Sequence, residues 1–357
     1  MTRIDGALIS AVKYFRPKSN HSEDLLLSSI HYKVAFGIIL ACAILTGLTS
    51  WYSPIECTRP SGSVFDMSYV RQKCYAYSSY IIEGPHADEG IFHGIINRAS
   101  NEKNSYVYVN YYQWVTLCLV IQAASFQVPR VLWKALEGGR TRKLVEQFRE
   151  LEAATNNVRV ERIILLAQRL QSRRQNETTR YFYMFLICQA FYFFNVIIQF
   201  SLTQNFLNGQ FISLVPKWLK GMPVLNIVFP KAVKCDLESY GSGGSTEHQN
   251  VICILAINVL NEKIYILLWV VFMLALVTAI LQLVYVTVMA TSENLRNNDL
   301  EIPEEFRKGN TSGRPLVTQG EWLLLRFLKS NLDDSRLFEN FISEFIKNRI
   351  HRYVNQI

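Results

Sequence analysis

Four long stretches of this sequence contain no Asp, Glu, Lys or Arg. They are Val34–Tyr52, Tyr106–Val128, Tyr181–Phe200 and Ile264–Ala290, with lengths of 19, 23, 20 and 27 residues. A helix needs roughly 20 apolar residues to cross a hydrocarbon core of about 30 Å. Half of the 357 residues are hydrophobic and 18% are charged. These runs predict four membrane-spanning helices, and they exclude both an ordinary cytosolic enzyme and a mostly disordered chain.

The distribution of basic residues predicts how the four spans are oriented. Of the 37 Lys and Arg residues, 27 lie in the first, third and fifth of the segments that flank the spans, and ten lie in the second and fourth. Segments rich in Lys and Arg remain on the cytoplasmic side of a membrane. Both termini and the central loop are therefore expected in the cytoplasm. Because the same rule explains the net charge of +8, we expect no nucleic-acid partner.

This topology divides the chain into nine segments. The stretch Phe211–Phe229 competes as a fifth span, but it contains two lysines and two prolines that are costly in a bilayer. We therefore place it in an ordered extracellular loop. The segments are a cytoplasmic N-terminal segment (1–33), the first span (34–52), the first extracellular loop (53–105), the second span (106–128), a cytoplasmic helical loop (129–180), the third span (181–203), the second extracellular loop (204–263), the fourth span (264–290) and a cytoplasmic helical tail (291–357).

The seven cysteines are consistent with this assignment. Cys42, Cys118 and Cys188 lie inside spans, where cysteine packs as a small apolar residue. The other four lie in the two extracellular loops, and none lies in a segment assigned to the cytoplasm. Disulfides persist outside the cell but not in the cytosol, so this partition agrees with the orientation. The loop cysteines form no CxxC pair, so a zinc site is not expected.

The pairing of the loop cysteines can be argued from their height above the membrane. Cys57 and Cys253 each lie close to a span, whereas Cys74 and Cys235 lie deeper in their loops. The Cα atoms of a disulfide must lie within about 7 Å of one another, so similar height is a necessary condition. Pairing like with like gives Cys57–Cys253 and Cys74–Cys235, which would join the two loops. One bridge within each loop remains the alternative.

Several short motifs occur in order along the chain, from the second span into the tail. Together they resemble the innexins, the invertebrate gap-junction proteins. Two positions depart from the usual family pattern, Ala256 and Gln189. The motifs are Tyr111-Tyr112-Gln113-Trp114-Val115, Pro129-Arg130-Val131-Leu132-Trp133-Lys134 followed by Glu137-Gly138-Gly139, Phe229-Pro230-Lys231 leading to Lys234-Cys235, Asn258–Tyr265 followed by Leu268-Trp269, and Gly320–Leu325.

The resemblance implies a ring-shaped channel. Four spans in one subunit cannot enclose a wide aqueous pore, so a channel requires a closed ring of subunits, and in the innexins the ring has eight. Two rings on apposed cells would dock through their extracellular loops, with this chain or other innexins as partners. The amino-terminal segment of the family folds into the pore mouth, which here assigns Arg3 and Asp5 as pore-lining charges.

Two further features have a structural and a functional interpretation. The aromatic side chains of Tyr111, Tyr112 and Trp114 form either a belt at the membrane interface or, with Gln113 and Val115, a packing motif between helices. Pro129 ends the second apolar run, where it either ends the helix or acts as a hinge that changes the width of the pore.

The cytoplasmic segments show the periodicity of helices. In the tail, six apolar residues recur at spacings of three and four, which predicts a helix that packs against the helices of the central loop. We therefore expect a small helical dome beneath the spans. Arg173 and Arg174 next to the membrane are either a solvated anchor or a contact with acidic membrane lipid. The six residues are Leu337, Phe338, Phe341, Ile342, Phe345 and Ile346.

The predicted fold is an all-α, plasma-membrane protein with a four-helix bundle, two disulfide-braced loops and a cytoplasmic dome. No catalytic triad, paired carboxylates or metal-ligand cluster stands out in the sequence, so we expect no enzyme activity, metal or cofactor. An undocked hemichannel that releases small molecules is a close alternative to a gap junction. A four-span adhesion or scaffold protein without a pore is the alternative from another class.

Overall fold

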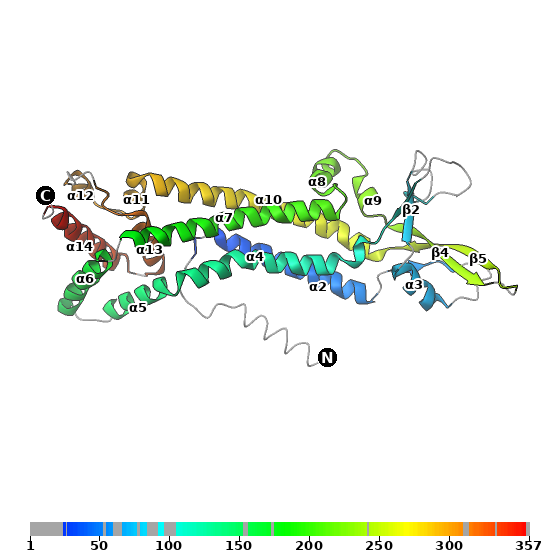
Figure 1. Ribbon diagram of the computed structural model, residues 1–357, viewed down its shortest axis with the longest axis horizontal. Helices are drawn as coiled ribbons and strands as arrows, with labels where there is room; N and C mark the ends of the chain where they lie inside the picture. Colours follow the sequence, from blue (N-terminus) through cyan, green and yellow to red (C-terminus); the bar gives the residue numbers. More distant parts are fainter. Residues whose placement is uncertain are drawn as a thin grey trace. The chain divides into compact units, whose positions relative to one another are not determined.

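A computed structural model of the chain describes residues 24–25, 27–52, 55–59, 66–76, 79–83, 92–95, 105–152, 156–172, 175–240, 243–309, 314–332 and 334–354. It divides into two compact units (Figure 1). The loop unit comprises residues 30–128 and 192–278, and the dome unit comprises residues 1–29, 129–191 and 279–357. Three long helices contribute residues to both units, and each unit is described by itself.

Four helical segments in the described part of the chain are long and apolar enough to cross a membrane. The first joins a π-helical stretch, η1 (Ile30–Ala35), to α2 (Phe36–Tyr52). The others are α4 (Val115–Glu137), α7 (Gln175–Phe206) and α10 (Ala256–Thr291). The prediction of four spans is confirmed. Each helix is shifted or longer than its charge-free run, because a helix continues into the polar region on either side of a membrane.

The start of the second span is the largest correction to the predicted boundaries. We expected it at Tyr106, but residues Ser105–Tyr108 form strand β3 and α4 begins at Val115. The strand pairs with β2 (Ser79–Glu83), with Tyr106 opposite Ile82. Tyr106 and Tyr108 are exposed while Val107 between them is partly buried, which is the period of two of a strand. A lack of charge cannot distinguish such a strand from the first turns of a helix.

Within the loop unit, η1, α2 and parts of α4, α7 and α10 share one apolar core. Small residues such as Ala35, Ala43 and Ala123 lie in it beside large aromatic side chains. The rings of Phe126 and Phe272 stack with their centroids 6.0 Å apart. Small residues let helix backbones approach closely in a membrane, where packing rather than exclusion of water holds helices together.

A ladder of polar side chains joins α4 to α7 inside this core. Gln122 donates to the hydroxyl of Thr203 at 2.8 Å, and Gln199 donates to the hydroxyl of Ser125 at 2.8 Å. The four side chains are buried or half-buried. Polar groups in hydrocarbon must find partners within the protein, and each such interhelical bond contributes on the order of 1 kcal/mol. The ladder therefore fixes which faces of the two helices meet.

The remainder of the loop unit is a five-stranded antiparallel sheet with short helices around it. None of these strands was predicted from the sequence. The strand order is β1-β5-β4-β2-β3. The elements not yet given are β1 (Glu56–Cys57), α3 (Met67–Ala76), the 3-10 helix η2 (Tyr111–Gln113), α8 (Phe211–Leu219), α9 (Val224–Val228), β4 (Ala232–Tyr240) and β5 (Thr246–Ile254). Helices α8 and α9 occupy the stretch that competes as a fifth span.

The dome unit is helical, as predicted. It contains α5 (Arg140–Glu152), α6 (Asn156–Gln171), α11 (Glu293–Asp299), α12 (Glu304–Gly309), α13 (Gln319–Asn331) and α14 (Ser335–Val354), with the inner ends of α4, α7 and α10. Helix α14 packs against α6, and α13 packs against α5. All six apolar tail residues that define the predicted face of α14 are buried in the core of the dome.

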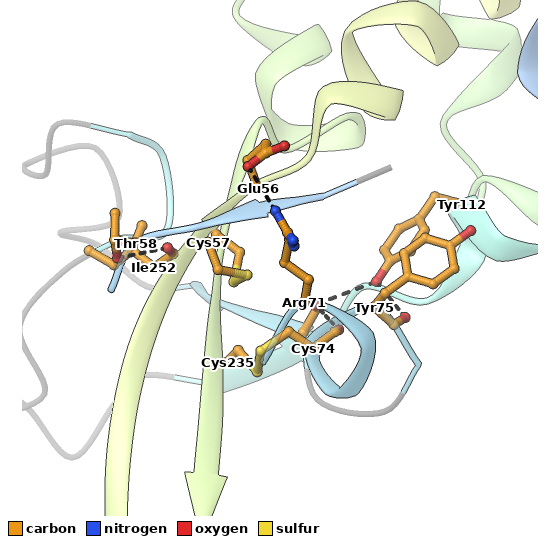
Figure 2. Close-up of a disulfide and its surroundings, with 11 residues drawn as sticks. Glu56, Cys57, Thr58, Arg71, Cys74, Tyr75, Tyr112, Cys235 and Ile252 are labelled. Atoms are coloured by element: carbon orange, nitrogen blue, oxygen red, sulfur yellow. Dashed lines mark hydrogen bonds and ion pairs between the residues drawn. A yellow bond between two sulfur atoms is a disulfide. The ribbon is translucent and has the colours of Figure 1, made fainter. Parts of the chain in front are cut away.

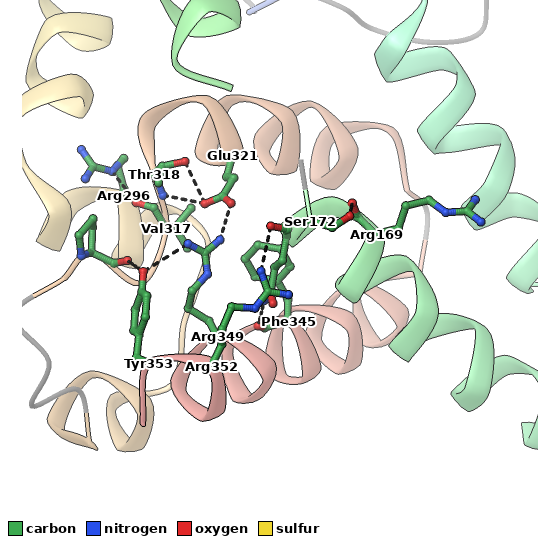
Figure 3. Close-up of polar contacts among 12 residues, drawn as sticks. Arg169, Ser172, Arg296, Val317, Thr318, Glu321, Phe345, Arg349, Arg352 and Tyr353 are labelled. Atoms are coloured by element: carbon green, nitrogen blue, oxygen red, sulfur yellow. Dashed lines mark hydrogen bonds and ion pairs between the residues drawn. The ribbon is translucent and has the colours of Figure 1, made fainter. Parts of the chain in front are cut away.

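The carboxylates of Glu137 and Glu321 cap two helices of the dome. Glu137 is fully buried, and it accepts hydrogen bonds from the backbone N–H groups of Gly139 and Thr141 at 2.6 and 2.5 Å. It thereby caps α5, while Gly138 and Gly139 adopt left-handed φ angles of 65° and 73° that favour glycine. Glu321 likewise forms a capping box with Thr318 at the start of α13, and it also pairs with Arg349 of α14 (Figure 3).

Gly320 holds α13 against the first turn of α7. A Cβ atom at this position would overlap the backbone carbonyl of Thr178. A carbonyl in a helix cannot swing aside, so we expect Gly320→Ala to force the helices apart and to destabilise the dome by about 1–3 kcal/mol. Gly37, also helical, has no atom within 4 Å of its Cβ position, which makes Gly37→Ala the control.

The measurement is the thermal unfolding midpoint of the purified protein. We expect a clear decrease for Gly320→Ala and little change for Gly37→Ala. Equal midpoints for the two variants would contradict the close approach at Gly320.

Candidate functional site

Two disulfides join the first loop to the second (Figure 2). Cys57 is bonded to Cys253 with 4.0 Å between the Cα atoms, and Cys74 is bonded to Cys235 with 5.6 Å between them. The structure thus brings together the pairs that the height argument favours and not the pairs within one loop. The sulfur atoms of Cys57, Cys74 and Cys253 lie within 4.8 Å of one another. All three are in disulfides, so they offer no thiolate to a metal.

The sheet interleaves the two loops. Strands β4 and β5 form a hairpin of the second loop, paired from Ala232 opposite Ile254 to Tyr240 opposite Thr246. Strands of the first loop flank this hairpin on both sides, with β1 next to β5 and β2 next to β4. Cys57 and Cys253 are directly opposite each other in neighbouring strands, so this bridge reinforces the backbone ladder. The result is one rigid module rather than two separate loops.

Hydrogen bonds tie helix α3 to the same module. The hydroxyl of Ser79 donates to the backbone carbonyl of Cys74 at 2.7 Å, and Ser79 lies opposite Cys235 in the sheet. The N–H of Thr58 donates to the carbonyl of Ile252 at 2.9 Å, which extends the ladder beyond β1. Burial raises the pKa of the Tyr75 phenol, which therefore stays neutral.

The Tyr-Tyr-Gln-Trp-Val motif forms the junction between this module and α4. Tyr112 is buried and its hydroxyl donates to the carbonyl of Tyr75 at 3.1 Å, while the amide of Gln113 donates to the same carbonyl at 2.5 Å. Val115 is buried at the start of α4, and Trp114 is 57% exposed. The structure therefore places Tyr112 in a packing role and leaves Trp114 facing outward.

Tyr111 faces the other side of the junction. Its ring packs edge-to-face against Phe206 and Phe229, with centroids 6.2 and 6.1 Å apart. Phe229 belongs to the motif of the second loop. The residues just before the second span thus contact the motif of the second loop directly, in addition to the two disulfides and the strand pairing.

The motif at the start of α10 meets the motif of the second loop. The side chain of Asn258 donates to the carbonyl of Pro230 at 2.9 Å, and the buried carboxylate of Glu262 lies 3.4 Å from the amine of Lys231. Lys263 donates to the same carboxylate at 2.6 Å. This pairing of two sequence motifs was not predicted, because the two segments are 28 or more residues apart and no local pattern links them.

The sequence of β4 contains a pattern from which this strand could have been predicted. In β4, Val233, Cys235 and Leu237 are buried and alternate with Lys234 and Asp236, which are partly exposed. Alternation of apolar and charged residues over several positions is typical of a half-buried strand.

Two other predicted sites have different outcomes. Arg3 and Asp5 lie outside the residues that the structure describes. Pro129 does not end its helix, since α4 continues to Glu137, and the prediction of a helix end at this residue is wrong. Eight further residues, Arg130 to Glu137, continue the helix after it. Pro129 has no N–H to donate to the carbonyl four residues earlier, and it is the first residue of the dome unit in α4.

Comparisons of the sequence with known proteins find matches over most of the chain. A family profile described as Innexin matches residues 24–349. Innexin shaking-B of Drosophila melanogaster is 28% identical over 332 residues, covering 88% of this chain and 87% of its own length. Innexin inx4 of the same species is 27% identical over 353 residues, covering 93% of each chain. Innexin inx2 of Schistocerca americana is 28% identical, covering 90% of this chain and 92% of its own.

The disulfide pairing predicts the outcome of a single substitution. Cys57→Ser should leave Cys253 as a free thiol and should leave the Cys74–Cys235 bridge intact, since these cysteines are on separate elements. Peptide mapping without reduction, with alkylation of free thiols, measures both. Recovery of a peptide that links Cys57 to Cys74 in the unmodified protein would overturn the pairing.

Proposed function

The chain belongs to the innexin family, and on that premise we infer that it is a subunit of gap-junction channels in the plasma membrane. Four helices that are long and apolar enough to cross a membrane fit a multi-pass protein of this family. Innexins are channel proteins, and their self-association into oligomers is a property of the family.

The interleaved sheet is the observation that supports docking between cells. A surface that binds the same surface of a second ring must keep its shape before contact, because ordering a flexible loop on binding costs free energy. Two bridges and a five-stranded sheet hold both loops of one subunit in a fixed arrangement. We propose that this module contacts the module of a subunit in the apposed membrane.

We further propose a ring of eight subunits, as the family resemblance implies, formed by this chain alone or with other innexins. Lys and Arg residues next to the spans would contact acidic membrane lipid. The amino-terminal segment, with Arg3 and Asp5, would line the mouth of the pore. Pro129 remains a candidate hinge within α4, because proline weakens the helix at that point without ending it.

The three candidate activities can be distinguished in one assay. Pairs of cells that express only this chain should transfer a small anionic dye and should be electrically coupled. Dye uptake by single cells without transfer between pairs would support the undocked hemichannel instead. A chain that reaches the surface but supports neither process would be a scaffold. Pairs expressing Cys74→Ser, which breaks the sheet module, serve as the control and should lose transfer.

A second prediction concerns the amino-terminal charges. If the segment lines the pore, Asp5 is repeated once per subunit around the axis, and the fields of a charge ring add within a confined path. We therefore expect Asp5→Lys to shift the reversal potential toward anion preference. The matched control is Glu304→Lys, at an exposed position of α12 in the dome. Exposed charges are screened over about 8 Å at physiological salt, so a charge away from the path has little effect.

The measurement is the reversal potential of single channels under a salt gradient. Equal, negligible shifts for the two variants would place Asp5 away from the permeation path while leaving the channel itself intact.

A further inference from the structure

The dome unit contains a cavity that none of the roles above uses. Its volume is about 480 Å³, which is within the usual range for small-molecule sites. Its floor is apolar and buried, formed by Leu144, Leu170, Tyr181 and Leu324 from four different helices. The side chain of Leu166 and the backbone at Gly320 complete the wall.

The rim of the cavity is basic. Arg140 and Lys143 come from the first turn of α5, and Arg169 comes from the last turn of α6. All three side chains are exposed. Lys143 and Arg169 form no ion pair with any residue that the structure describes, and the Arg140 guanidinium lies over the ring of Tyr181 at 5.3 Å. In Figure 3, the Arg169 side chain points away from the Glu321–Arg349 pair. Glu177 is the one acidic residue of the lining.

Three helices begin at this cavity. Arg140 is the first residue of α5, Thr178 lies in the first turn of α7, and Gly320 lies in the first turn of α13. The amino-terminal end of a helix carries a partial positive charge. Glu137 and the Thr318–Glu321 capping box occupy first-turn N–H groups of α5 and α13. An anion would therefore be held by the three basic side chains, because the carboxyl-terminal end of α6, whose last turn also lines the cavity, opposes the positive ends of the other helices.

The charge-free run of α7 places this cavity next to the expected membrane surface. Tyr181 is the first residue of the third charge-free run, and Thr178 precedes it by three residues, or about 4.5 Å along the helix. The cytoplasmic leaflet is rich in anionic lipid, so phosphate groups are concentrated at this height. An apolar floor beneath a basic rim also matches a ligand with a charged head and an apolar or ring-shaped body.

We propose that this cavity is a binding site for a multiply phosphorylated anion, held by Arg140, Lys143 and Arg169 above an apolar floor. The phosphates can come from a phosphoinositide of the cytoplasmic leaflet or from a soluble inositol phosphate. The site does not depend on docking or on the pore, so its test is a binding measurement.

The experiment uses the full-length protein in nanodiscs of phosphatidylcholine. One arm is titrated with dioctanoyl phosphatidylinositol 4,5-bisphosphate, and the other with inositol 1,4,5-trisphosphate, which has the same head without acyl chains. Calorimetry measures both affinities. Saturable binding in the first arm alone identifies the membrane lipid as the source, and equal binding in both arms identifies the soluble ligand.

Charge variants make the prediction specific to the cavity. Arg140→Gln, Lys143→Gln and Arg169→Gln should each weaken binding by about three- to tenfold, since each removes a charge-assisted contact. Glu177→Gln should strengthen binding, by about twofold to fivefold, because it removes the opposing charge. The matched control is Arg142→Gln, on the same helix but outside the cavity, where Arg142 pairs with Glu146 at 2.8 Å.

A variant that fills the cavity tests the floor independently. Leu166→Trp keeps every charge and should weaken binding at least as much as loss of one cation, provided that the thermal unfolding midpoint is retained. If this variant unfolds, the charge variants still decide. The proposal is overturned if neither ligand binds saturably, if Arg142→Gln weakens binding as much as Lys143→Gln, or if a folded Leu166→Trp protein binds like the unmodified one.

Discussion

A hydrocarbon layer contains no hydrogen-bond partner, and this constraint determines where each kind of structure occurs in the chain. Backbone N–H and C=O groups in the layer must be paired within a helix, so the spans are helical and free of charge. Polar side chains within the spans can pair between helices, as Gln122 and Gln199 do with Thr203 and Ser125. Strands with open edges are confined to the loops, where water is available to the unpaired groups.

Several charged residues near the ends of the spans form hydrogen bonds and ion pairs that join neighbouring segments of the chain. Glu137 follows the second span and caps α5, and Glu262 precedes the fourth and pairs with Lys231 and Lys263. Glu321 both starts α13 and holds Arg349 of α14. The short motifs that identify the family lie at these junctions. Their carboxylates join neighbouring segments through these hydrogen bonds and ion pairs.

The sequence predicted the elements whose pattern is local. Four charge-free runs predicted the spans. The spacing of Phe338, Phe341 and Phe345 predicted the buried face of α14. The start of the second span was wrong, because residues Ser105–Tyr108 lack charge for a reason other than membrane insertion: they alternate as a strand. The order of the sheet was missed, since it depends on pairing between strands that are 154 or more residues apart in the sequence.

The candidate site was predicted less completely than the spans. The cysteine pairs were predicted from one quantity, the height of each cysteine above the membrane. The number of residues between a cysteine and the nearest span approximates this height well. The contact of Asn258 with Pro230 and that of Tyr111 with Phe229 required the direction of side chains, which no sequence pattern supplies. The basic cavity of the dome combines α5, α6, α7 and α13, and its residues are spread over three separate segments of the chain.

Both disulfides join the first loop to the second, and this has a consequence for biosynthesis. Cys235 follows Cys74 by 161 residues, and Cys253 follows Cys57 by 196. At ribosomal rates of about 5–20 residues per second, the first two thiols wait roughly 10 to 40 seconds for their partners. During that interval Cys57 and Cys74 are the only loop cysteines on the oxidising side, so a premature bridge between them must be avoided or exchanged. A chain with both bridges has therefore delivered both loops across the membrane before its oxidation was complete.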